Sequence, residues 1–312
     1  MALYACLDRA AIEGLARQFG VDDITKSSVM DGGRENTNYC IETNSGKYVL
    51  TLCDQKSLTH ATNLASLLVH LTDHGIRTSE IIALPEGPAV ILHDQKPVML
   101  KRHVDGGITA DLTGNLLVQL GVEMARLHET PAPSYLPKSF PYGRSYFPEV
   151  MDSNLDHAYI DWLAEKNRFL QKRIPQSLPM ALIHGDVFFD NVIVQGDQLM
   201  AIIDFEEACH YYRSFDLGMV IVGACRNGQG VCFEKARRFI GGYQNNATLQ
   251  PVERECLQAF AVYAAVATSF WRFRQYHIRR PEPQLYDQHV DMQTLADTIS
   301  GYSQSSFTKL FS

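Results

Sequence analysis

The feature that most constrains the fold is the stretch at residues 182–216, which reads LIHGDVFFDNVIVQGDQLMAIIDFEEACHYYRSFD. It contains three short apolar runs separated by polar segments, at 182–183, 192–194 and 199–203. The Gly196-Asp197 pair between the second and third runs is typical of a hairpin turn. The stretch therefore predicts a loop followed by a hairpin, with polar side chains gathered where the strands end.

The polar residues of this stretch have the spacing that phosphoryl transfer from ATP requires. Asp186 precedes Asn191 by five positions, and Asp204 ends the next apolar run. In this interpretation Asp186 accepts the proton of the substrate hydroxyl, while Asn191 and Asp204 hold Mg²⁺ through hard oxygen ligands. Single Asp and Asn residues are more often turn or capping residues. The ordered set of three nevertheless favours the functional interpretation.

The motif formed by His184-Gly185-Asp186, Asn191 and Asp204-Phe205 resembles that of the aminoglycoside phosphotransferase and choline kinase superfamily. Four stretches are similar to its homoserine kinase branch: GGRENTNYCIETNSGKYVLTL (32–52), LGVEMARLHE (120–129), HGDVFFDNVIV (184–194) and IIDFEEACHYYRSFDLG (202–218). The resemblance extends from about residue 30 to about residue 276. It implies a two-lobed α+β fold like that of protein kinases, with ATP and Mg²⁺ as cofactors.

The implied lobes differ in structure and role. The N-terminal lobe, residues 1–104, would contain a small antiparallel sheet and bind the nucleotide. The larger C-terminal lobe, residues 105–312, would be mainly helical and carry the catalytic and substrate-binding residues.

Composition limits the class of protein and of partner. The 312 residues, 46% hydrophobic and 20% charged, are typical of a globular protein with room for two lobes. The net charge of −7, without a Lys/Arg cluster, argues against a nucleic-acid partner. Seven scattered cysteines without a C-x-x-C pair are typical of reduced thiols in the cytoplasm. With no signal-peptide pattern and no long apolar run, we expect a cytoplasmic monomer or homodimer that binds a small molecule and no membrane.

The N-terminal lobe is predicted to contain a helix at 7–19 and a sheet. The strands are expected at 27–30, 37–43, 48–53, 81–84, 89–93 and 97–102. The turn at 44–46 joins two of them as a hairpin. After the last strand, the segment 103–107 is predicted to form the hinge, and the backbone of Arg102, His103 and Val104 is predicted to bind the adenine edge.

The loop at 31–36 is predicted to cover the ATP phosphates. It contains Gly32, Gly33 and Asn36, and glycines let backbone N–H groups approach an anion closely. The alternative is a plain hairpin turn, which two adjacent glycines mark more often. The position before the catalytic segment, in the order of a kinase, favours the phosphate-binding interpretation.

The chain departs from the wider superfamily in its third strand. Thr51 occupies the position of the Lys that normally holds the α- and β-phosphates. The helix predicted at 58–74 contains no Glu that could pair with such a Lys. The homoserine kinase branch tends to have Thr at this position as well. Lys56, Lys101 and Arg34 are candidates for neutralising the phosphates, and each also fits a solvated surface charge.

The C-terminal lobe is predicted to be mainly helical, with helices at 112–129, 156–173, 215–225, 233–243, 252–277 and 285–302. The segment 131–148, rich in Pro and aromatic residues, is too long for a simple connection, so we expect a packed flap near the substrate. Asp216 either caps the helix around it or, as the resemblance implies, is buried and braces the catalytic loop. His184 is expected to orient that loop.

Glu206 and Glu207 bear on the choice of acceptor. Carboxylates beside the transfer site suit a cationic acceptor, because a buried ammonium group needs a countercharge. Glu206 fits either this role or the metal shell, and Glu207 also fits a solvated surface residue. An acceptor carboxylate would need an arginine. The sequence offers Arg144, Arg213, Arg272 and Arg274.

The expected function is ATP-dependent phosphorylation of the hydroxyl of a small amino alcohol. Homoserine, phosphorylated in threonine biosynthesis, is the first choice of acceptor. Choline, ethanolamine or an aminoglycoside is the alternative acceptor within the superfamily. A catalytically silent nucleotide-binding relic, suggested by the missing Lys, is the alternative of a different class.

Overall fold

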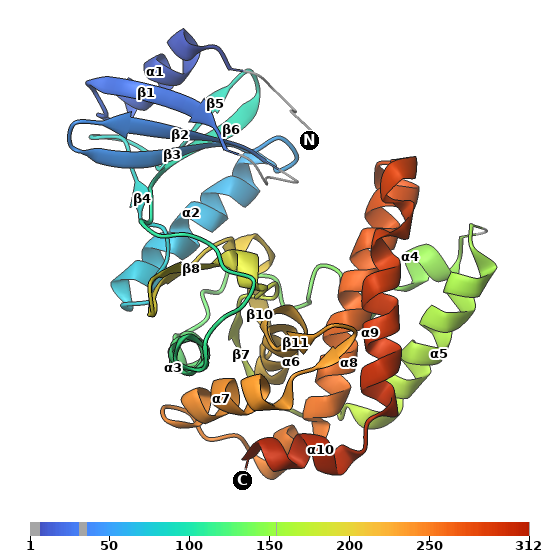
Figure 1. Ribbon diagram of the computed structural model, residues 1–312. Coiled ribbons are helices and arrows are strands. Elements are labelled where there is room, and N and C mark those ends of the chain that lie inside the picture. Colours follow the sequence, from blue (N-terminus) through green and yellow to red (C-terminus); the bar gives the residue numbers. More distant parts are fainter. Residues whose placement is uncertain (1–6, 31–35, 154, 312) are drawn as a thin grey trace. The chain divides into compact units, whose positions relative to one another are not determined.

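The computed structural model describes residues 7–30, 36–153 and 155–311 (Figure 1). The chain divides into two compact units. The first comprises residues up to Gly106 together with Met200–Ile203, and the second comprises Gly107–Leu199 and the chain from Asp204 onward. The predicted lobes had placed residues 200–203 in the second lobe. They belong to the first unit because the Ile202 N–H donates a hydrogen bond to the Arg77 carbonyl oxygen, at 2.9 Å.

The first unit contains an antiparallel sheet with strand order β1-β2-β3-β6-β4, in which β5 also pairs with β6. The strands are β1 Ile24–Val29, β2 Thr37–Thr43, β3 Gly46–Leu52, β4 Ile81–Ile82, β5 Val90–His93 and β6 Lys96–Arg102. β2 and β3 form the predicted hairpin, with Thr43 opposite Gly46. Alternate side chains, including Tyr39, Ile41 and Leu50, point to one face and pack with helix α1 in a buried core.

Two helices complete this unit, on opposite sides of the sheet in Figure 1: α1 Arg9–Gln18 and α2 Leu58–Asp73. Each helix begins after a polar side chain that binds a free N–H group of its first turn. The Asp8 carboxylate accepts from the Ala11 N–H at 2.7 Å, and the Ser57 hydroxyl accepts from the His60 N–H at 3.3 Å. The Asp8 cap explains why α1 begins two residues later than the helix predicted at 7–19.

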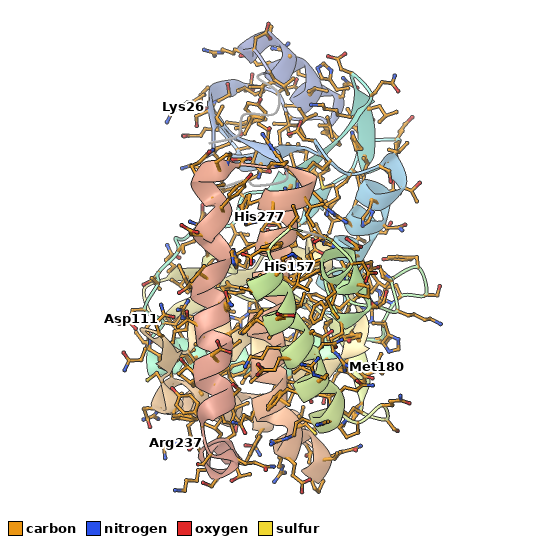
Figure 2. All side chains as sticks on the ribbon, turned by 90° about the vertical axis from the view of Figure 1, so that its right-hand side faces the viewer. Lys26, Asp111, His157, Met180, Arg237 and His277 are labelled. Carbon is orange, nitrogen blue, oxygen red and sulfur yellow. The ribbon has the colours of Figure 1, made fainter. Side chains whose placement is uncertain are left out.

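The second unit is mainly helical, and with the sheet unit it confirms the predicted α+β class. Its helices are α3 Gly114–Glu129, α4 Pro148–Met151, α5 His157–Arg173, α6 Arg213–Ala224, α7 Phe233–Gln244, α8 Pro251–Phe273, α9 Val290–Gly301 and α10 Gln304–Thr308. α5 and α9 flank α8, with their side chains packed against it (Figure 2). Almost the whole length of α8 from Cys256 to Phe270 is buried. This helix is the centre of the unit's hydrophobic core.

The described chain also contains three two-stranded sheets, two within the second unit and a third whose last strand ends in residues 200–202 of the first unit. β7 Met180–Ile183 pairs with β10 Cys209–Tyr212, β8 Val192–Gln195 with β9 Gln198–Ile202, and β11 Arg226–Asn227 with β12 Gly230–Val231. The β8–β9 pair is the hairpin predicted around Gly196-Asp197. The Asp197 carboxylate accepts hydrogen bonds from Thr113 and Asn115 at the start of α3, at 2.6 and 2.7 Å. The hairpin turn is thereby fixed to the helix.

Two predicted helices near the C-terminus are more irregular than expected. The helix predicted at 252–277 ends at Phe273 and continues as a π-helix, Arg274–Arg279. The one predicted at 285–302 is a 3-10 helix, Pro283–His289, followed by α9. Two prolines, Pro281 and Pro283, lie in the chain between α8 and α9 and disfavour a regular helix there.

The helices and the cysteines of the described chain bear on the expectations from composition. No helix in the described part of the chain is long and apolar enough to cross a membrane. The described cysteines are free thiols: Cys40, Cys53, Cys209, Cys225, Cys232 and Cys256.

Helices α3 and α7 approach each other through glycines. A Cβ atom on Gly121 of α3 would overlap the backbone of Phe239 and Tyr243, and one on Gly242 of α7 would overlap the Val118 carbonyl. The two backbones are therefore in contact, and no larger residue fits at these two positions without moving a helix.

We predict that Gly121→Ala lowers the free energy of unfolding by about 1–3 kcal/mol, because the added methyl group forces the two backbones apart. Gly241→Ala is the matched control, since a Cβ atom there would have nothing within 4 Å. On helix propensity, this control should keep or raise stability by up to about 1 kcal/mol. Denaturant unfolding of the three proteins measures both effects. Equal stability of the two variants would contradict the close contact.

Candidate active site

The loop after β7 carries Asp186 and folds back on itself. The Asp186 N–H donates to His184 Nδ1 at 3.1 Å. The Asp186 carbonyl oxygen accepts from the Phe188 N–H at 3.1 Å and from Asn191 Nδ2 at 2.8 Å. A 3-10 turn, Phe189–Asn191, then leads into β8. His184 and Asn191 thus both bind the backbone of Asp186, so the three residues of the motif form one small structure.

The Asp216 side chain binds the backbone of this loop. Its carboxylate is fully buried and accepts hydrogen bonds from the N–H groups of His184 and Gly185, both at 2.7 Å. His128 Nε2 lies 3.2 Å from the same carboxylate, and His128 Nδ1 lies 2.9 Å from the Tyr243 hydroxyl. α6 begins at Arg213, so Asp216 lies inside the helix and is not its N-cap. The contacts are those that a bracing role requires.

Gly185 has a local reason to be glycine. Its φ is +89°, in the left-handed region that side chains disfavour. A Cβ atom there would also lie 2.8 Å from Phe140 Cε2 and 3.0 Å from the Glu207 carbonyl oxygen. The glycine lets the loop turn between β7 and the aromatic side chain of Phe140.

The environment of Asp186 raises the pKa of its carboxyl group to about 7. Burial is the largest cause, and the negative charges of Asp204 and Asp190 add to it. The Tyr142 hydroxyl and the positive charge of Arg272 oppose the rise. A carboxylate with a pKa near neutrality is a better proton acceptor than an ordinary aspartate.

Asp204 and Asn191 supply the oxygens of a possible metal site. Asp204 has a left-handed backbone, φ 70° and ψ 57°, which turns the chain into the 3-10 helix Phe205–Glu207. Phe205 is buried against the His184 ring, with centroids 4.4 Å apart, and this contact holds the turn beside the loop. Since Asn191 Nδ2 is used by the Asp186 carbonyl oxygen, Oδ1 is the amide atom that can bind a metal.

This donor set fits Mg²⁺. Among the described residues, no three His, Cys, Asp or Glu side chains gather closely enough to hold a metal by themselves. Mg²⁺ is usually bound by one or two protein oxygens together with the phosphate oxygens of a nucleotide. An amide and a carboxylate oxygen are therefore sufficient as the protein's share.

Glu206 and Glu207 follow Asp204 in the same 3-10 helix, and both are half-buried. The negative charge of Glu207 acts on Cys209 and on Arg274. The two glutamates thus belong to the same unit and the same turn as Asp204, as the sequence indicates.

Part of the predicted nucleotide site lies outside the described residues, namely Gly32, Gly33 and Arg34. Asn36 is described and is buried just before β2. Thr51 is the residue that the sequence predicts at the position of the superfamily's Lys. It is buried, and its hydroxyl donates to Asn38 Oδ1 on the neighbouring strand at 2.7 Å. A neutral hydroxyl–amide pair therefore occupies this position.

The backbone of the predicted hinge is partly used by the sheet. The Arg102 N–H donates to the Glu80 carbonyl oxygen at 2.8 Å, and the His103 N–H donates to that of Lys47 at 3.0 Å. Within the described chain no acceptor binds the Val104 N–H. Of the three predicted N–H donors for adenine, Val104 is the one that the sheet leaves available.

Sequence reasoning did not find Tyr142 or assign His128 its partner. The Tyr142 hydroxyl donates to Asp186 Oδ1 at 3.2 Å. It comes from the Pro- and aromatic-rich segment predicted to be a packed flap, and Phe140, Tyr142 and Phe147 of that segment are indeed buried. The aromatic content was the available signal, but it did not indicate which ring reaches Asp186.

Comparison with known proteins defines the family. The model of the phosphotransferase enzyme family matches residues 28–256, which include every residue of the loop described above. The chain belongs to this phosphotransferase family. It is 26% identical over 281 residues to the homoserine kinase of Nitrobacter hamburgensis, covering 85% of this chain and 84% of that protein.

Two solved structures that share this fold are kinases for small molecules. The amicoumacin kinase hAmiN, in complex with AMP-PNP, Ca²⁺ and Ami, superposes with a TM-score of 0.74 at 15% identity, covering 96% of this chain and 97% of the other. A microcompartment-associated aminopropanol kinase superposes with a TM-score of 0.73 at 16% identity, covering 97% and 100%. The predicted kinase-like fold is confirmed, and the phosphotransferase is a small-molecule kinase.

We predict that Asp186→Asn lowers kcat by about 10²–10⁴-fold with little change in ATP binding, because it removes the carboxylate expected to accept the proton and keeps the shape of the loop. Asp190→Asn is the control. It removes an exposed carboxylate four residues further along the same loop and should keep kcat within about threefold. Steady-state kinetics and nucleotide binding separate the two variants. A near-normal kcat for Asp186→Asn would remove this residue from the mechanism.

Proposed function

We propose that this phosphotransferase transfers the γ-phosphoryl group of ATP, with Mg²⁺, to the hydroxyl of a small amino alcohol, and that homoserine is the acceptor. The observation that carries the reaction is the Asp186 loop, in which Tyr142 binds the Asp186 carboxylate and Asn191 binds its backbone. The acceptor is supported by the likeness to homoserine kinases over 85% of the chain. An acceptor with an amine alone is the second candidate, favoured by the fold shared with an aminopropanol kinase.

The residues of the second unit have distinct roles in this proposal. Asp186 receives the proton of the acceptor hydroxyl. Asn191 Oδ1 and the Asp204 carboxylate would hold Mg²⁺, which supplies positive charge beside the transferring phosphoryl group. Asp216 and His184 keep the loop in place through its backbone. Glu206 and Glu207 offer negative charge to the acceptor's ammonium group.

The acceptor's carboxylate needs a cation, and the four arginines have different environments. Arg213 forms a bidentate ion pair with Glu253, in which Nε donates to Oε1 at 2.8 Å and Nη2 donates to Oε2 at 2.6 Å. Arg144 Nε donates to Asn167 Oδ1 at 2.9 Å. Arg274 is buried, and its Nη1 lies 3.2 Å from Glu149. Each of these three guanidinium groups thus binds a side chain of the protein.

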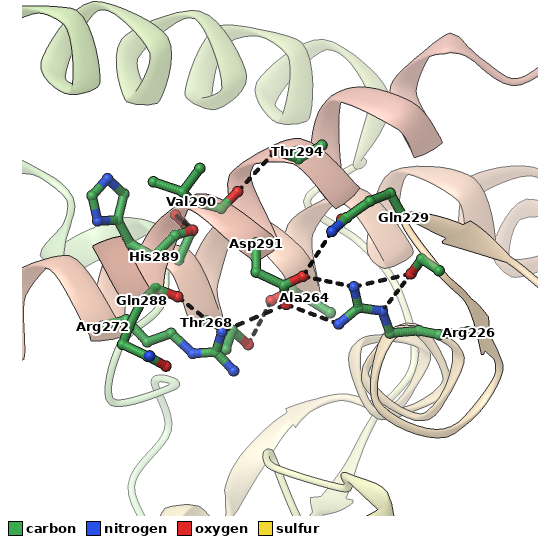
Figure 3. A network of polar contacts seen from close by, with 12 residues as sticks. Arg226, Gln229, Ala264, Thr268, Arg272, Gln288, His289, Val290, Asp291 and Thr294 are labelled. Carbon is green, nitrogen blue, oxygen red and sulfur yellow. Dashed lines mark hydrogen bonds and ion pairs between the residues drawn. The ribbon is translucent and has the colours of Figure 1, made fainter. Parts of the chain in front are cut away.

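Arg272 differs from the other three. Its Nη1 donates to the Gln288 carbonyl oxygen at 3.0 Å and lies 3.8 Å from Asp291 (Figure 3). Both oxygens of Asp291 are bound more closely by Arg226, at 2.8 and 2.9 Å. Arg272 is also close enough to Asp186 for its charge to act on that carboxyl group. Because its charge reaches the Asp186 carboxyl group, we assign the acceptor's carboxylate to Arg272.

A catalytically silent relic is the competing proposal, because the superfamily's Lys is absent. A relic has no use for a proton acceptor, yet this chain keeps Asp186 with two neighbours, Tyr142 and Asn191, bound to it. The loop is also braced by a buried carboxylate. These contacts support an active enzyme.

An ADP-release assay with matched acceptors tests the proposal. Homoserine is compared with 3-aminopropan-1-ol, which lacks the carboxylate, and with 4-hydroxybutanoate, which lacks the amine; choline and an aminoglycoside complete the panel. We expect homoserine to have the highest kcat/KM and each truncated acceptor to lose at least about tenfold, since one charged contact is worth about 1.5–3 kcal/mol. The Asp186→Asn protein is the background control. Equal use of 3-aminopropan-1-ol would contradict homoserine, and no ADP release with any acceptor would favour the relic.

We predict that Arg272→Gln raises the KM for homoserine about ten- to hundredfold and leaves the KM for Mg·ATP unchanged, because a charged partner of the carboxylate is lost. The KM for 3-aminopropan-1-ol, which has no carboxylate, should not change. Arg279→Gln is the control, since this arginine is 56% exposed in the π-helix that follows α8. A parallel rise for both acceptors would show that Arg272 acts on the site as a whole and does not bind the carboxylate.

A further inference from the structure

Tyr142 contacts the carboxylate of Asp186, which receives the proton in the proposed reaction. It is buried, and its hydroxyl donates to Asp186 Oδ1 at 3.2 Å while lying 3.4 Å from the Gly185 carbonyl oxygen. A phenol has one proton to donate, so the carboxylate and the carbonyl share it. The carboxylate is the stronger acceptor of the two because it is charged.

The segment around Tyr142 is anchored on three helices. The Tyr142 ring packs on Phe140, with centroids 4.2 Å apart, and Phe140 packs on Phe215 of α6 at 4.4 Å. The Arg144 N–H donates to the hydroxyl of Tyr263 on α8 at 2.9 Å, and Arg144 Nε binds Asn167 on α5. The position of the Tyr142 hydroxyl is therefore set before any substrate binds.

We propose that Tyr142 is a positioning residue for phosphoryl transfer: it fixes Oδ1 of Asp186, so that Oδ2 receives the proton of the acceptor hydroxyl. A carboxylate held at one oxygen cannot rotate freely about its Cβ–Cγ bond, and its second oxygen then keeps a constant direction. This inference rests on the proposed function, because it assigns Tyr142 a role in that reaction.

The step can be written so that its atoms and electrons balance. The acceptor oxygen forms a bond to the γ-phosphorus, and the bond from that phosphorus to the β–γ bridging oxygen breaks. The electron pair of the broken bond leaves with ADP. The proton of the acceptor hydroxyl passes to Asp186 Oδ2, while Tyr142 keeps its own proton and its hydrogen bond to Oδ1.

A merely structural role for Tyr142 makes a different forecast. If the hydroxyl only satisfies a buried polar contact, its loss should lower stability and should affect binding and turnover alike or not at all. If it positions Asp186, the loss should appear in kcat, and it should depend on Asp186 being present.

The test begins with Tyr142→Phe, which keeps the ring and removes the hydroxyl. We expect kcat to fall about ten- to hundredfold, the usual loss for a hydrogen bond to a charged group. The KM values for acceptor and Mg·ATP should stay within about twofold. Tyr135→Phe is the matched control, because Tyr135 lies in the same segment and is 39% exposed, and its kcat should not change. A normal kcat for Tyr142→Phe would overturn the proposal.

A double-mutant cycle with Asp186→Asn supplies the decisive measurement. In the Asp186→Asn background, Tyr142→Phe should leave the residual turnover unchanged, because there is no carboxylate left to position. An equal fold loss in both backgrounds would overturn the proposal, since Tyr142 would then act independently of Asp186. If wild type is active and Asp186→Asn is not, but Tyr142→Phe is normal, this inference fails alone. If wild type phosphorylates no acceptor, both the inference and the proposed function fail.

Discussion

The structure of the site depends on one buried carboxylate. Asp216 is enclosed by protein, and a charge in that position is stable only if its oxygens are fully bound. Two backbone N–H groups of the catalytic loop and a His128 nitrogen bind it. α6, which carries Asp216, is in turn pressed against α8, since a Cβ atom on Gly218 would overlap the Phe260 backbone. The loop is thus attached through α6 to α8, which is buried from Cys256 to Phe270, and this attachment holds Asp186 in place.

The sequence predicts those contacts of the site whose two residues are close along the chain, and it misses those whose residues are far apart. His184, Asp186 and Asn191 are close in the chain, and their spacing alone predicted a common loop, which the structure shows as local hydrogen bonds. The contact from Tyr142 to Asp186 joins residues 44 positions apart, and that from His128 to Asp216 spans 88. No local pattern encodes which of several tyrosines or histidines reaches a given carboxylate. Such pairs become visible only when the helices that carry them are placed.

The fold shows the same limit. Strand alternation and helical periodicity located nearly every element, and β2 at Thr37–Thr43 was predicted to the residue. The ends were less certain where capping decides them, as at Asp8 and Thr113. The π-helix after Phe273 and the glycine contact between α3 and α7 had no sequence signal, because both follow from packing against other parts of the unit. From sequence alone, a glycine inside a helix only predicts a less stable helix. Its role in packing becomes clear once the neighbouring helix is known.

The missing lysine bears on how charge is balanced in this enzyme. The Thr51 hydroxyl donates a hydrogen bond to Asn38 Oδ1, so a polar but uncharged pair occupies that position. A nucleotide bound by such a protein still carries several negative charges on its phosphates, and a neutral pair cannot offset them. In the absence of that lysine, the compensation has to come from other cations, among them the ion that Asn191 and Asp204 would hold. A kinase of this kind should depend on its metal more strictly than one with the lysine. The presence of both oxygen donors, Asn191 and Asp204, is therefore an argument for catalysis and against a relic.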